Sequence, residues 1–433
     1  MALLFFVNAG SAQTTYNPAK LYAKEALKAD LRFVRENLEK KHAGLYRYIT
    51  KPALNRFFDS LGTIITGPMT EQAFFNLLTL LHSRIRNGHT MFLPGDSATA
   101  YKRSGRYLPF MVYWADGKLT IIENNSADST IQPGMEIVTI NGTSTATITE
   151  QLLDRMTRDG YNQTYPVWIL NHYFSSYYSF TFGQPDTFLL QLKDKTGELQ
   201  MKQVAGLTKD SIKHLKQIRY PIASEEQGID LREEKEQHTA TLTIKTFDSD
   251  LLKDKYKQDY KKVFDSLFKQ INRHQVKNLI LDLRDNQGGN FYPGQTVLSY
   301  LVGAPSRFLL GGKEATIIQP RAARFKGKLF VLINGGSFSN TAIVCATLKR
   351  DRKVTFIGEE TGGNAHLISG DPEEFILPHT QIKAYISTVT YRIIADTNDG
   401  HGIIPNYSPL PATEDLLTGK DPAKALALKL IPD

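Results

Sequence analysis

The stretch VLINGGSFSNTAIVCATLKR, residues 331–350, decides the fold of the C-terminal half of the chain. Its first apolar run is typical of a buried strand, and a second run with a different period follows the turn at residues 334–339. A serine in this turn lies at a helix N-terminus, where free N–H groups and the helix dipole favour negative charge. Acyl transfer needs such a place, because its tetrahedral intermediate is negatively charged. Serine is also among the best helix caps, so the motif alone does not separate catalysis from capping.

Similar strand–turn–helix units surround this stretch. KNLILDLR, residues 277–284, has the unbroken apolar run of a buried strand and is followed by a turn at Gly288 and Gly289. KLFVLIN and KVTFIG predict the next strands. The alternation of strands and helices predicts parallel βαβ units, in which sites form at the carboxyl ends of the strands.

The chain before these units has different hydrophobic patterns. Residues 17–98 predict helices, the last of which ends at a turn-prone Asn87-Gly88 pair directly before His89. Residues 100–205 contain short segments rich in β-branched residues. The polar stretch 224–237 predicts a linker or a surface hairpin. We therefore expect an α+β multidomain protein, with an N-terminal helical region, a β domain and an α/β core at residues 215–433.

Composition excludes several classes of function. The chain has 433 residues, 41% of them hydrophobic and 22% charged, as in ordinary globular proteins. Its net charge is +8, but the basic residues are spread along the chain and interleaved with acids, which does not favour a nucleic-acid partner. The single cysteine, Cys345, allows no intrachain disulfide and is interpreted as a small buried hydrophobe. No metal-binding or nucleotide-binding motif is present, so we expect no metal and no cofactor.

The N-terminal residues 1–12 predict a signal peptide that lacks the usual basic beginning. A short apolar run, Leu3 to Val7, precedes small residues suited to cleavage. The run is far too short to span a bilayer, and no later segment reaches that length. We expect the protein to be exported to the periplasm or the extracellular space.

The motifs in this order resemble those of the C-terminal processing peptidases and their tricorn-like relatives, which are serine peptidases with a PDZ domain. The resemblance covers most of the chain and implies a PDZ-like domain at residues 100–205 and a crotonase-like α/β peptidase core at residues 215–433. The motifs that carry it are NGHT (87–90), GMEIVTING (134–142), LILDLRDNQGG (279–289), VLINGGSFSNTA (331–342), IGEETGG (357–363) and GHGIIPNYSPLPATEDLLTGKDPAKALAL (400–428).

The resemblance implies a nucleophile and an oxyanion hole. The family pattern S-A-S-A-x-E aligns with residues 337–342, so Ser339 takes the place of the nucleophile and Ser337 is the alternative. Ala342 replaces the glutamate of the pattern. The oxyanion hole would use the backbone N–H of Asn340 and that of Gly288 or Gly289.

The resemblance also implies the base. One branch of the family uses a lysine at the position where this chain has Asn364, and an amide cannot take a proton from serine. The tricorn-like branch uses a histidine, and His89 matches its position. A neutral imidazole is a suitable base near pH 7. Asp399 takes the place of the glutamate that orients this histidine in the family. The alternatives are Glu359 and Glu360 as acids, and His366 and His401 as bases.

These features imply a serine endopeptidase that hydrolyses peptide bonds in exported or partly unfolded proteins and peptides through an acyl-enzyme. The PDZ-like domain would bind an extended peptide end by strand addition and capture its carboxylate. Two alternatives are a catalytically inactive pseudo-peptidase and a PDZ-type peptide-binding protein. The first is suggested by the departures from the family patterns at Asn87, Ala342, Asn364 and Asp399. The sequence predicts no oligomeric state.

Overall fold

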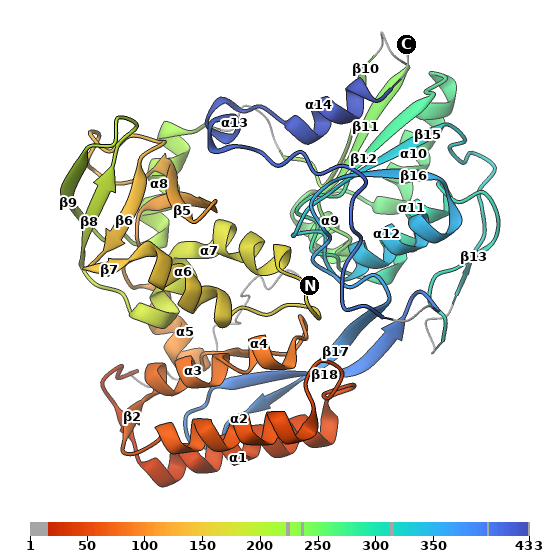
Figure 1. Ribbon diagram of the computed structural model, residues 1–433. Coiled ribbons are helices and arrows are strands. Elements are labelled where there is room, and N and C mark those ends of the chain that lie inside the picture. Colours follow the sequence, from red (N-terminus) through yellow and green to blue (C-terminus); the bar gives the residue numbers. More distant parts are fainter. Residues whose placement is uncertain (1–15, 222–225, 235–237, 312–315, 396–397, 432–433) are drawn as a thin grey trace.

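The computed structural model describes residues 16–431 except 222–225, 235–237, 312–315 and 396–397. The segment predicted as a signal peptide, residues 1–12, lies outside the described residues. Figure 1 shows three parts: N-terminal helices with a long hairpin at the bottom, a β-rich part at the left and an α/β part at the right. Within the described part of the chain, no helix combines the length and the apolar character needed to cross a membrane.

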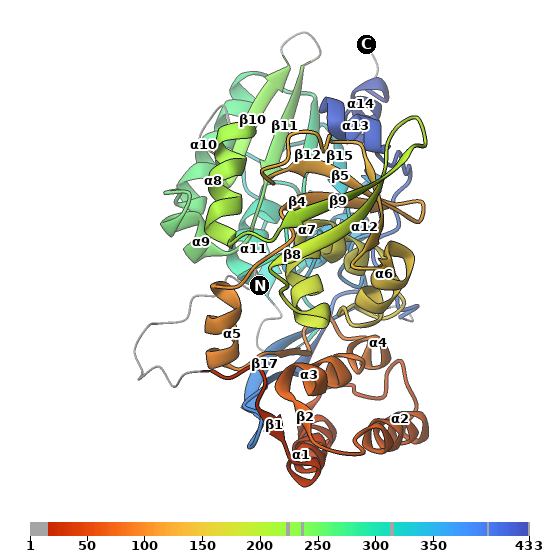
Figure 2. The ribbon, with the colours of Figure 1, turned by 90° about the vertical axis from the view of Figure 1, so that its left-hand side faces the viewer.

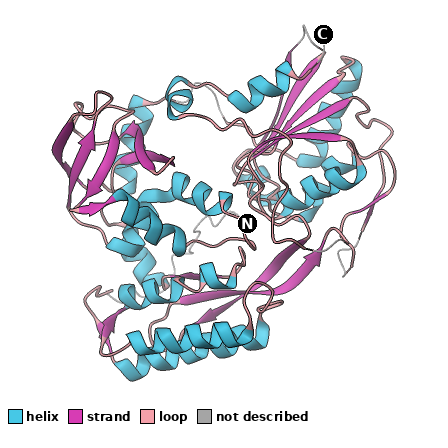
Figure 3. Ribbon diagram, in the orientation of Figure 1, coloured by secondary structure: helices cyan, strands magenta, loops and turns pink. Residues whose placement is uncertain are grey.

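The N-terminal part is built from helices and from a hairpin that comes from the other end of the chain. The helices begin at threonine caps in two cases, since Thr50 and Thr70 accept hydrogen bonds from the N–H groups of Ala53 and Ala73. The hairpin β17–β18 pairs with β3 and packs on the helices (Figures 1 and 3). The elements are β1 (Leu21–Tyr22), α1 (Lys24–Lys41), α2 (Lys51–Ile64), β2 (Met69–Thr70), α3 (Glu71–Thr79), α4 (His82–Ile85), β3 (Met91–Leu93), α5 (Asp96–Arg103), β17 (Leu367–Ile376) and β18 (Lys383–Arg392).

The hairpin shares one hydrophobic core with the helices. Leu377, Ile382 and Ile386 belong to the same buried cluster as Leu27 and Leu38 of α1. The turned view also places β17 beside the N-terminal helices (Figure 2). The boundary drawn along the sequence between a helical region at 17–98 and a core at 215–433 therefore does not separate two independent cores.

The β-rich part contains a sheet with the strand order β4-β5-β6-β8-β9, in which β7 also pairs with β6. Helix α7 packs along β4, where the Asn171 side chain accepts a hydrogen bond of 2.7 Å from the backbone N–H of Trp114. A peptide that added to β4 at this point would have to displace α7. The elements are β4 (Phe110–Ala115), β5 (Lys118–Asn124), β6 (Glu136–Ile140), β7 (Thr143–Ser144), α6 (Thr145–Asp154), α7 (Thr164–Phe182), β8 (Thr187–Lys193), β9 (Leu199–Ala205) and α8 (Lys209–Arg219).

The α/β part confirms the predicted parallel βαβ units. Its sheet has the order β10-β11-β12-β15-β16, and every pair except the antiparallel β10–β11 is parallel. The elements are β10 (Ile229–Glu234), β11 (Thr239–Ile244), α9 (Ser249–Asp254), α10 (Tyr260–Arg273), β12 (Asn278–Asp282), α11 (Phe291–Ser299), β13 (Ser306–Arg307), β14 (Ile317–Ile318), β15 (Lys328–Ile333), α12 (Asn340–Asp351), β16 (Val354–Gly358), α13 (Thr413–Thr418) and α14 (Pro422–Lys429).

Both faces of this sheet are covered, which explains the unbroken apolar runs of its strands. Along β12, Leu279 and Leu281 belong to the large core that includes residues of α10, α11 and α12. Ile280 points to the opposite face, where it clusters with Ala423 and Ala427 of α14. Alternate side chains of a strand point to opposite faces, so a strand buried on both faces has no polar alternation.

Candidate active site

Ser339 occupies the junction between β15 and α12 in a strained conformation. Its φ is 54° and its ψ is −122°. A positive φ of this size is a left-handed backbone conformation that residues other than glycine rarely adopt. Ser339 is the N-cap residue of α12, yet its side chain makes no capping hydrogen bond. Strain of this kind persists only where the surrounding structure enforces it, and it clusters at functional sites. The capping interpretation of this serine is therefore not supported, and its hydroxyl is available to another partner.

That partner is His89. The Nε2 atom of His89 lies 3.1 Å from the Oγ atom of Ser339, although the two residues are 250 positions apart. The loop that follows α4 presents His89 through Asn87, whose Oδ1 accepts the N–H of His89 at 3.0 Å. The Nδ2 atom of Asn87 in turn donates to the Oγ atom of Ser369 at 2.8 Å. A serine hydroxyl within hydrogen-bond distance of an imidazole is the geometry required for nucleophile activation.

The protonation state of His89 suits a base. Burial lowers the pKa of His89 from 6.5 to about 3, because the charged imidazolium loses its hydration. The ring is therefore neutral near pH 7 and can accept the serine proton. Its Nδ1 atom is buried and has no hydrogen-bond partner among the described residues.

Phe338 connects the nucleophile turn to the β-rich part. Its ring stacks on the His89 imidazole with a centroid distance of 4.8 Å and an interplanar angle of 21°. The Phe338 ring also stacks on Tyr165 of α7, with a centroid distance of 4.2 Å and an interplanar angle of 2°. Phe338 is buried in the same cluster as Trp168 and Ile169 of α7. The His89 imidazole is thus supported by the ring of Phe338, the residue directly before Ser339 in the sequence.

We expect Phe338→Ala to lower both stability and activity. Removing a buried phenylalanine costs about 3–5 kcal/mol of unfolding free energy, because it leaves a cavity. The loss of the ring also frees the His89 imidazole to turn away from Ser339. Urea denaturation and a peptidase assay would measure the two effects, with Phe338→Leu as the variant that keeps most of the buried volume. A folded Phe338→Ala protein with wild-type activity would contradict the role of the stack.

Two of the predicted oxyanion residues, Asn340 and Gly288, lie next to Ser339. Asn340 is the first residue of α12, where N–H groups have no intrahelical acceptor. Gly288, with a φ of 90°, packs so closely that an added Cβ would come within 2.7 Å of the Asn340 nitrogen. The Gly288 N–H donates to Oδ1 of Asn286 at 2.9 Å. Gly289 has a φ of 135° and packs on the backbone of Phe247 and Asp248, where an added Cβ would come within 2.2 Å of the Asp248 nitrogen.

Ser337, the alternative nucleophile, has a different environment. Its Oγ atom donates to the carbonyl of Leu283 at 2.8 Å and accepts the N–H of Asn334 at 3.1 Å. The residue is fully buried. Ser337 therefore holds the turn against the end of β12. The serine that lies within hydrogen-bond distance of His89 is Ser339.

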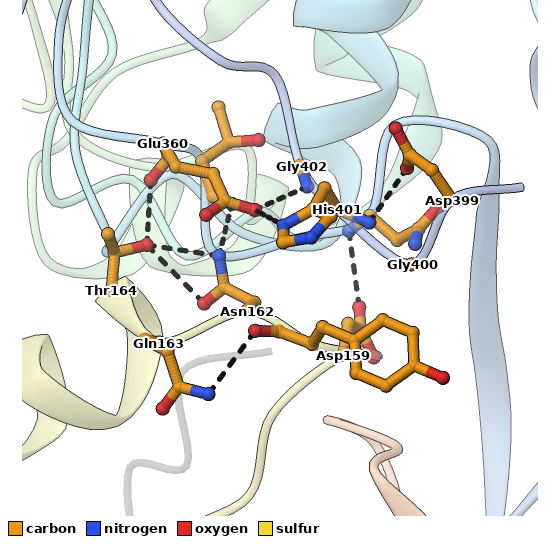
Figure 4. Close-up of polar contacts among 12 residues, drawn as sticks. Asp159, Asn162, Gln163, Thr164, Glu360, Asp399, Gly400, His401 and Gly402 are labelled. Atoms are coloured by element: carbon orange, nitrogen blue, oxygen red, sulfur yellow. Dashed lines mark hydrogen bonds and ion pairs between the residues drawn. The ribbon is translucent and has the colours of Figure 1, made fainter. Parts of the chain in front are cut away.

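The structure does not bring Asp399 to His89. The Oδ1 atom of Asp399 accepts the backbone N–H of His401 at 2.9 Å and lies 4.0 Å from Nε2 of His366. Figure 4 shows its carboxylate on the backbone N–H of His401, apart from the contact between Glu360 and the His401 ring. Its side chain is 64% exposed. An exposed carboxylate that closes a local turn cannot also reach a buried ring on another loop.

The alternative acids and bases form local contacts. Glu360 accepts the Gly402 N–H at 2.7 Å and lies 3.2 Å from Nδ1 of His401 (Figure 4). Glu359 lies 3.4 Å from the Gly335 N–H, and burial raises the pKa of its carboxyl. These contacts join the loop after β16 to its neighbours. Within the described residues, no group of three His, Cys, Asp or Glu side chains is arranged to hold a metal ion.

Asn364, at the position of the lysine in one family branch, is part of a polar network. Its Nδ2 atom lies 2.9 Å from Oδ1 of Asn398 and 3.4 Å from the hydroxyl of Tyr48. Its Oδ1 accepts the N–H groups of His366 and Leu367. The residue is buried and serves to shape the loop.

The sequence interpretation missed Asp159. Its carboxylate accepts the N–H of Gly88 at 2.8 Å, next to His89, and the N–H of Asn364 at 3.4 Å. Burial raises the pKa of Asp159 from 3.8 to about 6. The Asp159-Gly160 pair predicts only a turn. Nothing in its spacing relates it to residue 88, so only the fold could reveal the contact.

Comparisons with known proteins find one peptidase family and several similar folds. Residues 238–408 match the model of peptidase family S41. The structure is similar to that of mature CPAF, with a TM-score of 0.67 and 14% sequence identity over 94% of this chain and 96% of that one. Mature CPAF complexed with lactacystin gives the same TM-score and identity, with 94% and 97% of the two chains covered. No curated protein sequence matches the chain.

A candidate peptidase from Parabacteroides merdae is also similar. Its TM-score is 0.53 with 14% identity, and the match covers 95% of this chain and 98% of that one. At these identities the structural neighbours show the fold, while the family model identifies the α/β part that carries Ser339. The α/β part that carries Ser339 is thus similar to the peptidases of family S41, and the protein is a serine-type peptidase.

Proposed function

We propose that the protein hydrolyses peptide bonds through an acyl-enzyme formed on Ser339, with His89 as the base. The observation that carries this proposal is the 3.1 Å contact between Nε2 of His89 and Oγ of a strained serine at the start of α12. The hydroxyl makes no capping bond and has the imidazole as its partner. The fold joins the two residues from separate parts of the chain.

The reaction follows from these positions. The Nε2 atom of His89 takes the Ser339 proton as Oγ attacks the carbonyl carbon, and the tetrahedral intermediate places negative charge on the former carbonyl oxygen. The Asn340 N–H at the start of α12 would stabilise that oxygen together with an N–H of Gly288 or Gly289. Use of Gly288 requires its N–H to leave Asn286. His89 then protonates the leaving amine, and water releases the acyl group by the same route.

The low pKa of His89 applies to the site without substrate. Once the oxyanion forms, its negative charge attracts the new imidazolium in a buried environment, where such attraction is much stronger than in water. Proton transfer is therefore coupled to attack. The neutral form predominates at every pH well above 3, so we expect no acid limb of activity from His89 itself near neutrality.

The substrates we propose are peptides and partly unfolded proteins outside the cytoplasm. We propose an extended chain because His89 is buried, so that only an unfolded segment could reach the pair it forms with Ser339. The β-rich part is proposed to bind such a chain. Helix α7 covers Trp114 of β4 through Asn171. A substrate strand could therefore pair with β4 only before Trp114, unless α7 moves.

Labelling with a fluorophosphonate probe tests the proposal. We expect wild-type protein to form a covalent adduct, and mass spectrometry should locate it on the peptide that contains Ser339. We also expect the protein to degrade an unfolded, reduced and alkylated protein faster than the same protein in its native state. Folded protein that neither labels nor degrades either form would contradict the proposal.

A catalytically inactive peptide-binding protein is the second candidate. The observation that favours it is the buried Nδ1 atom of His89, which has no acceptor among the described residues. A base that accepts a proton at Nε2 carries its own proton at Nδ1, and an unpartnered buried N–H costs about 1–3 kcal/mol. This candidate predicts saturable binding of an unfolded chain without labelling.

A further inference from the structure

We propose that Asp159 is a positioning residue for His89, which it holds through the backbone of Gly88. This inference rests on the Ser339–His89 chemistry proposed above. The carboxylate lies in the loop between α6 and α7, and one of its oxygens accepts the Gly88 N–H at 2.8 Å. The orientation of the next residue, His89, depends on this peptide group.

The second oxygen of Asp159 reaches the other side of the site. It accepts the N–H of Asn364 at 3.4 Å. The loop of Asn364 contacts the nucleophile turn directly, because the Gly363 N–H donates to the carbonyl of Ser337 at 3.3 Å. An added Cβ on Gly363 would come within 3.0 Å of the Ser339 nitrogen. One carboxylate thus joins the loop of the base to the loop that supports the nucleophile.

The loop that carries Asp159 is itself anchored. The N–H groups of Gly160 and Tyr161 donate to the carbonyls of Arg86 and Gly400 at 3.0 and 2.8 Å. The Asn162 Nδ2 donates to the Thr361 carbonyl at 3.1 Å. Figure 4 shows this loop facing the segments around Glu360 and Gly400–Gly402. These bonds fix the position from which the carboxylate holds Gly88.

The burial of the Asp159 carboxylate is a second feature that needs an explanation. The residue is buried, and no described Lys, Arg or His side chain forms an ion pair with it, although the charge of Arg47 acts on it from further away. An unpaired buried carboxylate is costly for stability, so its presence beside the base calls for a functional reason.

The groups around Asp159 determine its titration. Burial raises the pKa of its carboxyl to about 6, while the N–H groups of Gly88 and Asn364 and the charge of Arg47 lower it. As the pH falls through about 6, the carboxylate becomes neutral and its two hydrogen bonds weaken. The titratable and charged groups that interact with it are Arg47, Tyr48 and Tyr165.

The experiment compares the pH dependence of fluorophosphonate labelling in wild-type protein and in Asp159→Asn between pH 5 and 9. We expect the wild-type rate to rise through a pKa near 6 and the variant rate to lack this limb. At pH 8 we expect labelling of the variant to be about 10–100-fold slower, because a misplaced base costs rates of this order. Its melting temperature at pH 8 should be unchanged or higher, since a buried charge has been removed.

Two further variants make the result specific. Asp194→Asn changes an aspartate that also accepts backbone N–H groups, in the turn between β8 and β9, and should label as wild type. Asp399→Asn tests the carboxylate that the sequence favoured. A larger loss in Asp399→Asn than in Asp159→Asn, an unchanged acid limb in Asp159→Asn, or equal falls in its rate and melting temperature would overturn the inference.

Hydrogen exchange gives a readout that does not require activity. In Asp159→Asn we expect faster amide exchange in peptides that cover residues 87–90 and 359–366, and no change in the helices α1 and α2. Wild-type protein that fails to label would count against the proposed function, and unchanged exchange in these two loops would count against the inference. The two failures are therefore distinguishable.

Discussion

Ser339→Ala is expected to reduce kcat/KM for peptide hydrolysis by about 10⁴-fold or more, as the loss of the nucleophile does in other serine peptidases. The variant removes only a hydroxyl that has no structural hydrogen bond to α12, so its unfolding free energy should change little. A peptidase assay on an unfolded protein and urea denaturation would measure both quantities. Fluorophosphonate labelling should disappear.

Ser337→Ala is the matched control for Ser339→Ala. The Ser337 hydroxyl holds the turn through Leu283 and Asn334, so its loss should lower the unfolding free energy by about 1–3 kcal/mol. The folded variant should still label. If labelling survived Ser339→Ala and vanished in Ser337→Ala, the assignment of the nucleophile would be wrong.

His89→Gln is expected to give the second largest loss, about 10³–10⁶-fold in kcat. Glutamine can still donate a hydrogen bond to Ser339, but it cannot take the serine proton. Because the catalytic groups act as a unit, Ser339→Ala combined with His89→Gln should be little worse than Ser339→Ala alone. Steady-state kinetics of the two single variants and the double variant would measure this non-additivity.

Two other histidines serve as comparisons for His89. His214 is exposed on α8, and His214→Gln should retain wild-type kinetics. His401 pairs with Glu360 and is, with His366, one of the two alternative bases suggested by the sequence. A loss in His401→Gln that exceeds the loss in His89→Gln would move the role of the base to His401.

Much of the α/β part could be predicted from the sequence. The apolar runs at residues 277–284 and 328–333 predicted buried strands, and β12 and β15 lie there as parallel neighbours. The turn at residues 334–339 predicted a serine at a helix N-terminus, and Ser339 is the N-cap residue of α12. Such features are local: a run of side chains shows how many faces of a strand are buried, and a turn shows where the next helix begins.

The partners of each element could not be predicted in this way. Residues 367–392 form a hairpin that packs on helices more than 300 positions earlier in the chain, because its apolar residues complete their core. A pattern of apolar residues shows that a face is buried, but it does not show what covers it. The domain boundaries proposed from the sequence therefore did not predict that this hairpin packs in the N-terminal part.

The sequence by itself determined the strands of the core, the serine at the turn and the histidine after the helical region. The tertiary structure decided how these residues meet: it brings His89 to Ser339, leaves Asp399 on an exposed turn and places Asp159 against Gly88. The physical reason is that hydrogen bonds between distant loops depend on the packing of whole domains. The spacing of residues along the chain carries no record of that packing.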